Sequence, residues 1–81
     1  MVRDEAGNWR SLIAMNPKIL RGKPVIRGTR VPVRVIVGSL AAGMTVDEVC
    51  DEYSLKPEHV RAALAYAAEA LADEEVHALA D

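Results

Sequence analysis

The chain has 81 residues, of which 51% are hydrophobic, with a single cysteine and a formal net charge of -2. This length suits one domain, a lone cysteine excludes an internal disulfide, and no apolar stretch reaches the roughly 20 residues that cross a bilayer. We therefore expect a cytoplasmic protein without a membrane segment, with a flexible lead-in over residues 1–11 and one domain over residues 12–81.

The charges are unevenly placed along the chain. Residues 1–34 contain eight basic residues and two acids, whereas residues 35–81 contain ten acids and two basic residues. This asymmetry either provides one surface for an anionic partner or lets two oppositely charged segments attract each other within the fold.

Two short apolar runs, residues 12–15 and 23–26, begin the domain. The first ends at Asn16-Pro17, a turn dipeptide, and the second follows Arg21-Gly22. We predict a short β-hairpin from these runs, which must pack on helices because a two-stranded hairpin is not stable alone. Residues 27–30 then form a loop.

The next segment predicts two helices in succession. The first begins with Pro32 at its first helical position, where proline is accepted, and it stops at Gly43. The second begins at Thr45, which forms a capping box with Glu48. Apolar residues at helical spacing predict the buried faces of both helices. These are Val33, Ile36, Val37, Leu40 and Ala41 in the first helix and Val46, Val49, Cys50 and Tyr53 in the second.

A third helix is predicted from Pro57 toward residue 80. Its length exceeds what a compact three-helix core of this size can cover. A short capped helix, a brief turn and a longer helix form the helix-turn-helix arrangement. The predicted inward face of the third helix comprises Val60, Ala63, Leu64, Ala67 and Leu71.

The chain also carries a long motif. The run G-K-P-V-I-R-G-T-R-V-P-V occupies residues 22–33, and it is followed by G-M-T at 43–45, D-E at 47–48, P-E at 57–58 and V-R-A-A-L at 60–64. Over most of its length the sequence resembles the DUF433 family of small prokaryotic proteins. The resemblance implies a mainly α fold with a homeodomain-like helix-turn-helix three-helix core, here with a short N-terminal β-hairpin and a long C-terminal helix.

The resemblance also implies a function. DUF433 proteins are regarded as antitoxins similar in role to the VapB antitoxins, and their usual partner is a PIN-like ribonuclease toxin. One local feature departs from the family: many relatives have an extra residue and a Thr or Ser cap before the last helix, where this chain has Y-S-L-K-P at residues 53–57. We therefore expect a tighter turn here.

A basic loop is the best candidate for binding an anion. Arginine can hold a phosphate through two parallel hydrogen bonds, and Gly28 lets the backbone approach closely. The alternative is that Gly28 only serves a turn and the arginines pair with acids such as Glu48 or Asp51. The candidate nucleic-acid-binding residues of this loop and the helix after it are Arg27, Thr29, Arg30 and Arg34.

The start of the third helix is a second candidate for nucleic-acid contact. In a helix-turn-helix protein this part of the helix reads the major groove, which here places Lys56, His59 and Arg61 on the DNA. Glu58 would repel phosphate, so a single copy should bind weakly. Either a homodimer, which we expect, or a complex with a basic partner would be needed.

The end of the third helix is a candidate protein-binding segment. Leu71, Val76 and Leu79 lie in an acidic setting, which suits the basic RNA-binding surface of a ribonuclease toxin. The same helix could instead pair with its copy in a dimer, and a further alternative is a frayed, solvated tail.

Catalysis finds little support in the sequence. His59 and His77 are too far apart along one helix to share a metal, and Cys50 falls on a predicted buried stripe. No phosphate-binding loop or metal motif is present, so we expect no enzyme activity, no cofactor and no metal.

Our leading hypothesis is an antitoxin of a type II toxin–antitoxin pair that neutralises a PIN-like ribonuclease and also binds operator DNA. The alternatives are a stand-alone DNA-binding regulator and a protein-interaction adaptor without a nucleic-acid role.

Overall fold

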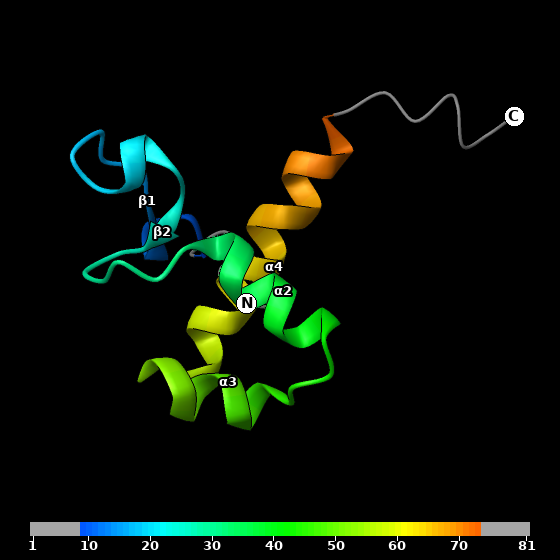
Figure 1. Cartoon of the computed structure of the whole chain (residues 1–81). Coiled ribbons are helices and arrows are strands. Elements are labelled where there is room, and N and C mark those ends of the chain that lie inside the picture. The colour runs from blue at the N-terminus through cyan, green and yellow to red at the C-terminus, as the bar shows by residue number, and fades with distance from the viewer. Residues whose placement is uncertain (1–8, 74–81) are drawn as a thin grey trace, which may run out of the picture.

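Three α-helices dominate the computed structural model, which describes residues 9–73 (Figure 1). The predicted mainly α fold, with a short antiparallel hairpin near the N-terminus and a long C-terminal helix, is confirmed. In chain order the elements are η1 (Trp9–Leu12), β1 (Ile13–Ala14), η2 (Leu20–Gly22), β2 (Val25–Ile26), α2 (Val33–Ala41), α3 (Val46–Tyr53) and α4 (Pro57–Ala72).

The hairpin is joined directly to the helical part. Strands β1 and β2 are antiparallel, with Ile13 opposite Ile26. On the other side of β2, the Ile26 N–H donates to the Val31 carbonyl at 3.0 Å, and the Val33 N–H donates to the Pro24 carbonyl at 3.0 Å. Because β2 is bonded on both sides, the hairpin and the start of α2 form one unit.

Helix α2 begins one residue later than predicted. Pro32 is its N-cap, with extended backbone angles, because this residue bridges to Val25 of the hairpin. The end of the helix is as predicted: Gly43 has φ +108, and its N–H donates to the Leu40 carbonyl at 3.0 Å. The Met44 N–H donates to the Ser39 carbonyl at 3.1 Å, which completes a Schellman motif.

The predicted capping box of α3 is confirmed. The Thr45 hydroxyl accepts the Glu48 N–H at 3.1 Å, and the Glu48 carboxylate accepts the Thr45 N–H at 2.8 Å. Two backbone donors that have no partner within the helix are thereby satisfied. Helix α3 therefore starts where the sequence places it.

The core lies where α2, α3 and α4 meet the hairpin. Its buried members are Ile13, Ile26, Val33, Ile36, Val49, Leu55, Val60, Ala62 and Ala63. Several predicted core positions are wrong: Ala41 is exposed, and Val46 and Leu64 are 40% and 42% exposed. Ala62 is instead fully buried. Alanines on the inner face of α4 allow this helix to pack closely on its neighbours, which turns Leu64 outward.

The start of the described chain packs on α4. The rings of Trp9 and Tyr66 meet edge to face with centroids 6.4 Å apart, and the Arg10 guanidinium lies 4.5 Å from the centre of the Trp9 ring. Arg10 also forms an ion pair with Glu69 of α4. Residues 9–11, which we expected to belong to the lead-in, are therefore part of the folded unit.

Candidate interaction surfaces

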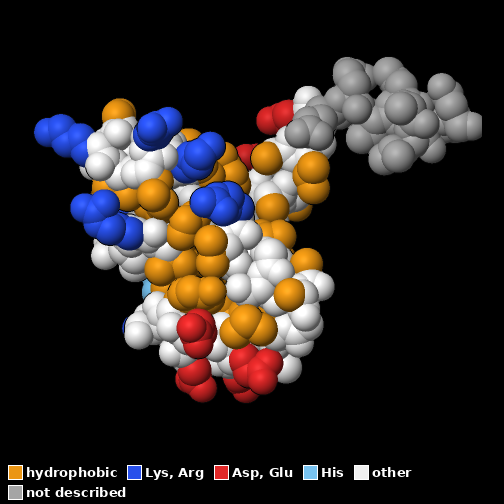
Figure 2. Space-filling view, in the orientation of Figure 1, with side chains coloured by type: hydrophobic (Ala, Val, Ile, Leu, Met, Phe, Trp, Pro, Cys, Tyr) orange, Lys and Arg blue, Asp and Glu red, His pale blue; other side chains and the backbone are white. Residues whose placement is uncertain are grey.

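Most of the basic side chains gather at the hairpin, and the acidic side chains of α3 lie at the opposite end of the molecule. Residues 9–46 contain seven basic residues and no acid, whereas residues 47–73 contain seven acids and two basic residues. Figure 2 shows basic side chains gathered over the hairpin and acidic side chains at the end formed by α3. Between residues 9 and 73 the only ion pair is Arg10–Glu69, so the loop arginines do not pair with Glu48 or Asp51.

The Arg27 side chain forms hydrogen bonds with two backbone carbonyls. Its Nε donates to the Ser11 carbonyl at 2.7 Å, and its Nη2 donates to the Ile13 carbonyl at 3.1 Å. The Arg27 N–H also donates to the Leu12 carbonyl at 2.8 Å. The planar guanidinium thus bridges two carbonyls, that of Ser11 before β1 and that of Ile13 within it.

Thr29 closes the loop in which it lies. Its hydroxyl donates to the Ile26 carbonyl at 2.7 Å and accepts the Val31 N–H at 3.0 Å. Gly28 has φ +82, a conformation that glycine adopts at little cost. The loop is therefore held by its own hydrogen bonds, and the Thr29 hydroxyl has one proton, which it already donates.

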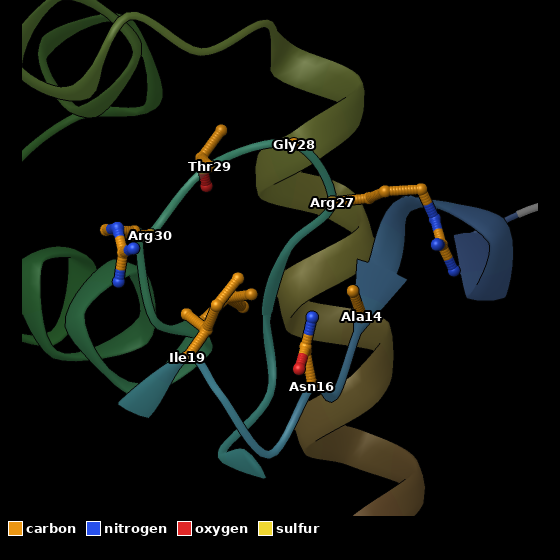
Figure 3. Close-up of a pocket in the computed structure, with 8 residues that line it drawn as sticks. Ala14, Asn16, Ile19, Arg27, Gly28, Thr29 and Arg30 are labelled. Atoms are coloured by element: carbon orange, nitrogen blue, oxygen red, sulfur yellow. The ribbon is translucent and has the colours of Figure 1, made fainter. Parts of the chain in front are cut away.

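The side chains of Arg27 and Arg30 extend in different directions. They leave the loop on opposite sides in Figure 3, although both residues line the same wide, open concavity of about 690 Å³. Arg30 is exposed, and Asn16, Ile19 and Val25 also line this concavity. Arg34 is exposed in the first turn of α2, a turn that contains no acidic residue.

The tip of the hairpin is a left-handed turn that the sequence analysis missed. Leu20, Arg21 and Gly22 have φ angles of 50, 60 and 83. The Gly22 N–H donates to the Ile19 carbonyl at 3.0 Å. Left-handed backbone costs roughly 1–2 kcal/mol at a non-glycine residue, and Gly22 was the only local signal for it.

This turn presents several cations. The Asn16 side-chain oxygen accepts the Lys18 N–H at 2.9 Å, which orders the approach to the turn. The cations of this turn and of the residues beside it, together with Arg30, form a surface that we call the hairpin end. Its exposed basic residues are Lys18, Arg21, Lys23 and Arg30.

The other nucleic-acid candidates lie at the α3–α4 corner, which consists of α3, residues 54–56 and the first turn of α4. His59 is half-buried, and its Nδ1 accepts the Lys56 N–H at 3.0 Å. Its imidazole therefore forms the reciprocal bond of a capping box by accepting the N–H of the N-cap residue, while the lysine side chain of that residue cannot act as an acceptor for the helix. Lys56 and Arg61 are exposed, and so is Glu58.

The outer side of α4 carries exposed leucines. Leu71 is 61% exposed and Leu64 is 42% exposed, and their spacing of seven residues places them on the same side of the helix. Asp73, also exposed, caps the C-terminus of α4. The two other predicted partner-binding residues, Val76 and Leu79, lie outside the described residues, as does His77.

Two further observations concern chemistry and membranes. Within residues 9–73 no group of three or more His, Cys, Asp or Glu residues could hold a metal ion, and Cys50 is half-buried as a free thiol. None of the described helices is long and apolar enough to cross a membrane.

Known proteins resemble this chain over much of its length. It is 42% identical over 65 residues to "Uncharacterized protein y4eO" of Sinorhizobium fredii strain NGR234, and 36% identical over 52 residues to "Putative antitoxin VapB45" of Mycobacterium tuberculosis strain H37Rv. These matches cover 79% and 64% of this chain but 29% and 22% of the relatives. The chain thus spans less than a third of the length of these relatives.

A solved structure and a protein family also match this chain. The crystal structure of Rv2018 from Mycobacterium tuberculosis has a TM-score of 0.62 at 33% identity, and the match covers 70% of this chain and 27% of that one. Residues 13–67 match the family described as "Protein of unknown function (DUF433)". Because this match includes more than half of the chain, the protein belongs to the DUF433 family.

Proposed function

We propose that this protein is an antitoxin that binds and masks a PIN-like ribonuclease toxin, and that it binds operator DNA as a homodimer. The observation that carries the first part is the exposed leucine pair on α4, Leu64 and Leu71. Similarity to the relative named VapB45 supports the same role. In this proposal the chain itself has no catalytic activity.

The chemistry of the α4 surface fits such a partner. Exposed apolar side chains at helical spacing suit insertion of a helix into an apolar groove. Two exposed acids accompany them, Glu69, which is paired with Arg10, and Asp73, which is the C-cap of α4. A ribonuclease binds a polyanion and so presents a basic surface around its RNA site, which an acidic helix with apolar anchors can cover.

The test is capture of the toxin by the tagged chain from its host, after nuclease treatment. We expect mass spectrometry to identify a PIN-like ribonuclease, and purified antitoxin to inhibit its cleavage of RNA. Leu71→Asp should abolish both capture and inhibition. Leu20→Asp is the matched control, because Leu20 is another exposed leucine, 40% exposed, at the hairpin tip.

Other results would point elsewhere. Capture by the Leu71→Asp variant at the wild-type level would remove the α4 surface from the proposal. A nuclease-resistant partner without ribonuclease activity would indicate an adaptor. If a parallel capture without nuclease recovers only material that nuclease removes, a stand-alone DNA-binding regulator is favoured, which the concentration of positive charge at the hairpin end supports.

A further inference from the structure

The α3–α4 corner is poorly charged for contact with DNA. In a helix-turn-helix protein the first helix crosses the phosphate backbone while the second enters the major groove. Here α3 carries four exposed acids, and Glu58 adds another at the start of α4. Against these stand only Lys56 and Arg61. The acids of α3 are Asp47, Glu48, Asp51 and Glu52.

The side chain at the centre of the corner already has a structural role. His59 would be the middle contact of the predicted trio, but its Nδ1 accepts the Lys56 N–H. This hydrogen bond fixes the imidazole at the start of α4 and leaves Nε2 as the nitrogen that could face a base. Repulsion between the exposed acids and phosphate is therefore the main effect that opposes DNA binding at the corner.

The hairpin end has the opposite properties. Its four cations are exposed, and no acid lies anywhere in residues 9–46. The segment that carries Lys18, Arg21 and Lys23 is ordered by the Asn16 side chain and by the hydrogen bonds of the left-handed turn. Arg27 and Thr29 hold the neighbouring loop in place, so they support this surface while Arg30 contributes to it.

The residue types at the hairpin end indicate whether its partner is DNA or an acidic protein. Met15 and Leu20 are exposed at this end and could serve as apolar anchors for a protein. Protein interfaces, however, are depleted in lysine and rely on aromatic anchors, whereas clustered lysine and arginine without acids is the footprint of phosphate contact. Aromatic residues, on which single-stranded bases would stack, are absent from residues 10–52.

We propose that the hairpin end, through Lys18, Arg21, Lys23 and Arg30, contacts the phosphate backbone of duplex DNA, and that the α3–α4 corner faces away from it. This inference rests on the DNA-binding part of the proposed function and is independent of the toxin. Toxin capture and DNA binding are separate assays, so the failure of one leaves the other standing.

The experiment compares two double variants of identical charge change. One is Lys18→Gln with Arg21→Gln at the hairpin end, and the other is Lys56→Gln with Arg61→Gln at the corner; each removes one lysine and one arginine, all four exposed. Binding of the purified chain to a fluorescent mixed-sequence duplex of about 20 base pairs is measured by anisotropy between about 50 and 200 mM salt, because phosphate contacts are independent of sequence. Circular dichroism verifies that both variants are folded.

We expect the hairpin variant to bind the duplex at least about tenfold more weakly than the wild type. The slope of log K against log salt concentration should also be smaller in magnitude by about two, because each phosphate contact contributes close to one to that slope. The corner variant should stay within about twofold of the wild type. Equal losses in both variants, a larger loss at the corner, or no duplex binding by the wild type at the lowest salt would overturn the inference. Equal competition by duplex and by poly-L-glutamate would also overturn it, and would assign the surface to an acidic protein.

Discussion

The Arg27 guanidinium lies 2.7 Å from the carbonyl oxygen of Ser11, sixteen residues earlier in the chain. A second donor of the same group reaches the Ile13 carbonyl. The segment before β1 is thereby tied to the loop after β2 by a side chain in addition to the strand hydrogen bonds. A residue that resembles a phosphate ligand in the sequence is thus a structural residue in the fold.

We expect Arg27→Lys to lower the free energy of unfolding by about 1 kcal/mol, because an ammonium group cannot bridge two carbonyls as a planar guanidinium does. Urea unfolding followed by circular dichroism measures the change. Arg30→Lys is the control, since the Arg30 side chain has no hydrogen-bond partner among residues 9–73, and it should change stability by less than about 0.5 kcal/mol. Similar losses in the two variants would contradict the assigned role of Arg27.

The cap on α4 gives a second prediction. His59→Ala removes the acceptor of the Lys56 N–H and should cost about 1 kcal/mol, which in a domain of this size lowers Tm by roughly 4–8 °C. His59→Gln should retain most of the stability, because glutamine is a preferred partner at this position of a capping box. Thermal unfolding of the two variants separates the cap from simple loss of packing, which would reduce both alike.

Substitution by alanine should change the free energy of unfolding in opposite directions at two glycines. Gly22 has φ +83, and an added Cβ would come no closer than 3.8 Å to Pro17, so Gly22→Ala should cost about 1–2 kcal/mol through backbone strain alone. Gly38 lies inside α2, and its added Cβ would meet no atom within 4 Å, so Gly38→Ala should stabilise the protein by roughly 0.5–1 kcal/mol. A raised urea midpoint for Gly22→Ala would contradict the left-handed turn, and a lowered midpoint for Gly38→Ala would contradict the open space beside α2.

Local signals were sufficient to predict most of the elements. Gly43 ends α2 and Thr45 begins α3 through hydrogen bonds to residues within five positions along the chain. The hairpin likewise follows from two short apolar runs and the turns that bound them. Such signals are readable because the chemistry that satisfies a helix end or a turn lies in adjacent residues.

The candidate surfaces were predicted less well. The sequence grouped Arg27 with Arg30 because they are close along the chain, yet they extend from opposite sides of the loop. It also assigned His59 to the DNA, whereas its imidazole caps α4. Residue type indicates what a side chain can bind, but its partners depend on what the fold places within reach.

By itself, then, the sequence determined the order of the elements, the glycine that ends α2, the capped start of α3 and the separation of charge along the chain, because each is a property of neighbouring residues. It did not determine the end of α4, which lies at Ala72 and not near residue 80. Tertiary structure alone decided that Ala62 is buried while Leu64 is exposed, that Arg27 reaches Ser11, and that the basic hairpin and the acidic α3 lie at opposite ends. These outcomes depend on how closely α4 packs on its neighbours and on contacts between distant residues. Hydrophobic periodicity gives the approximate inward side of a helix, and packing sets the exact rotation.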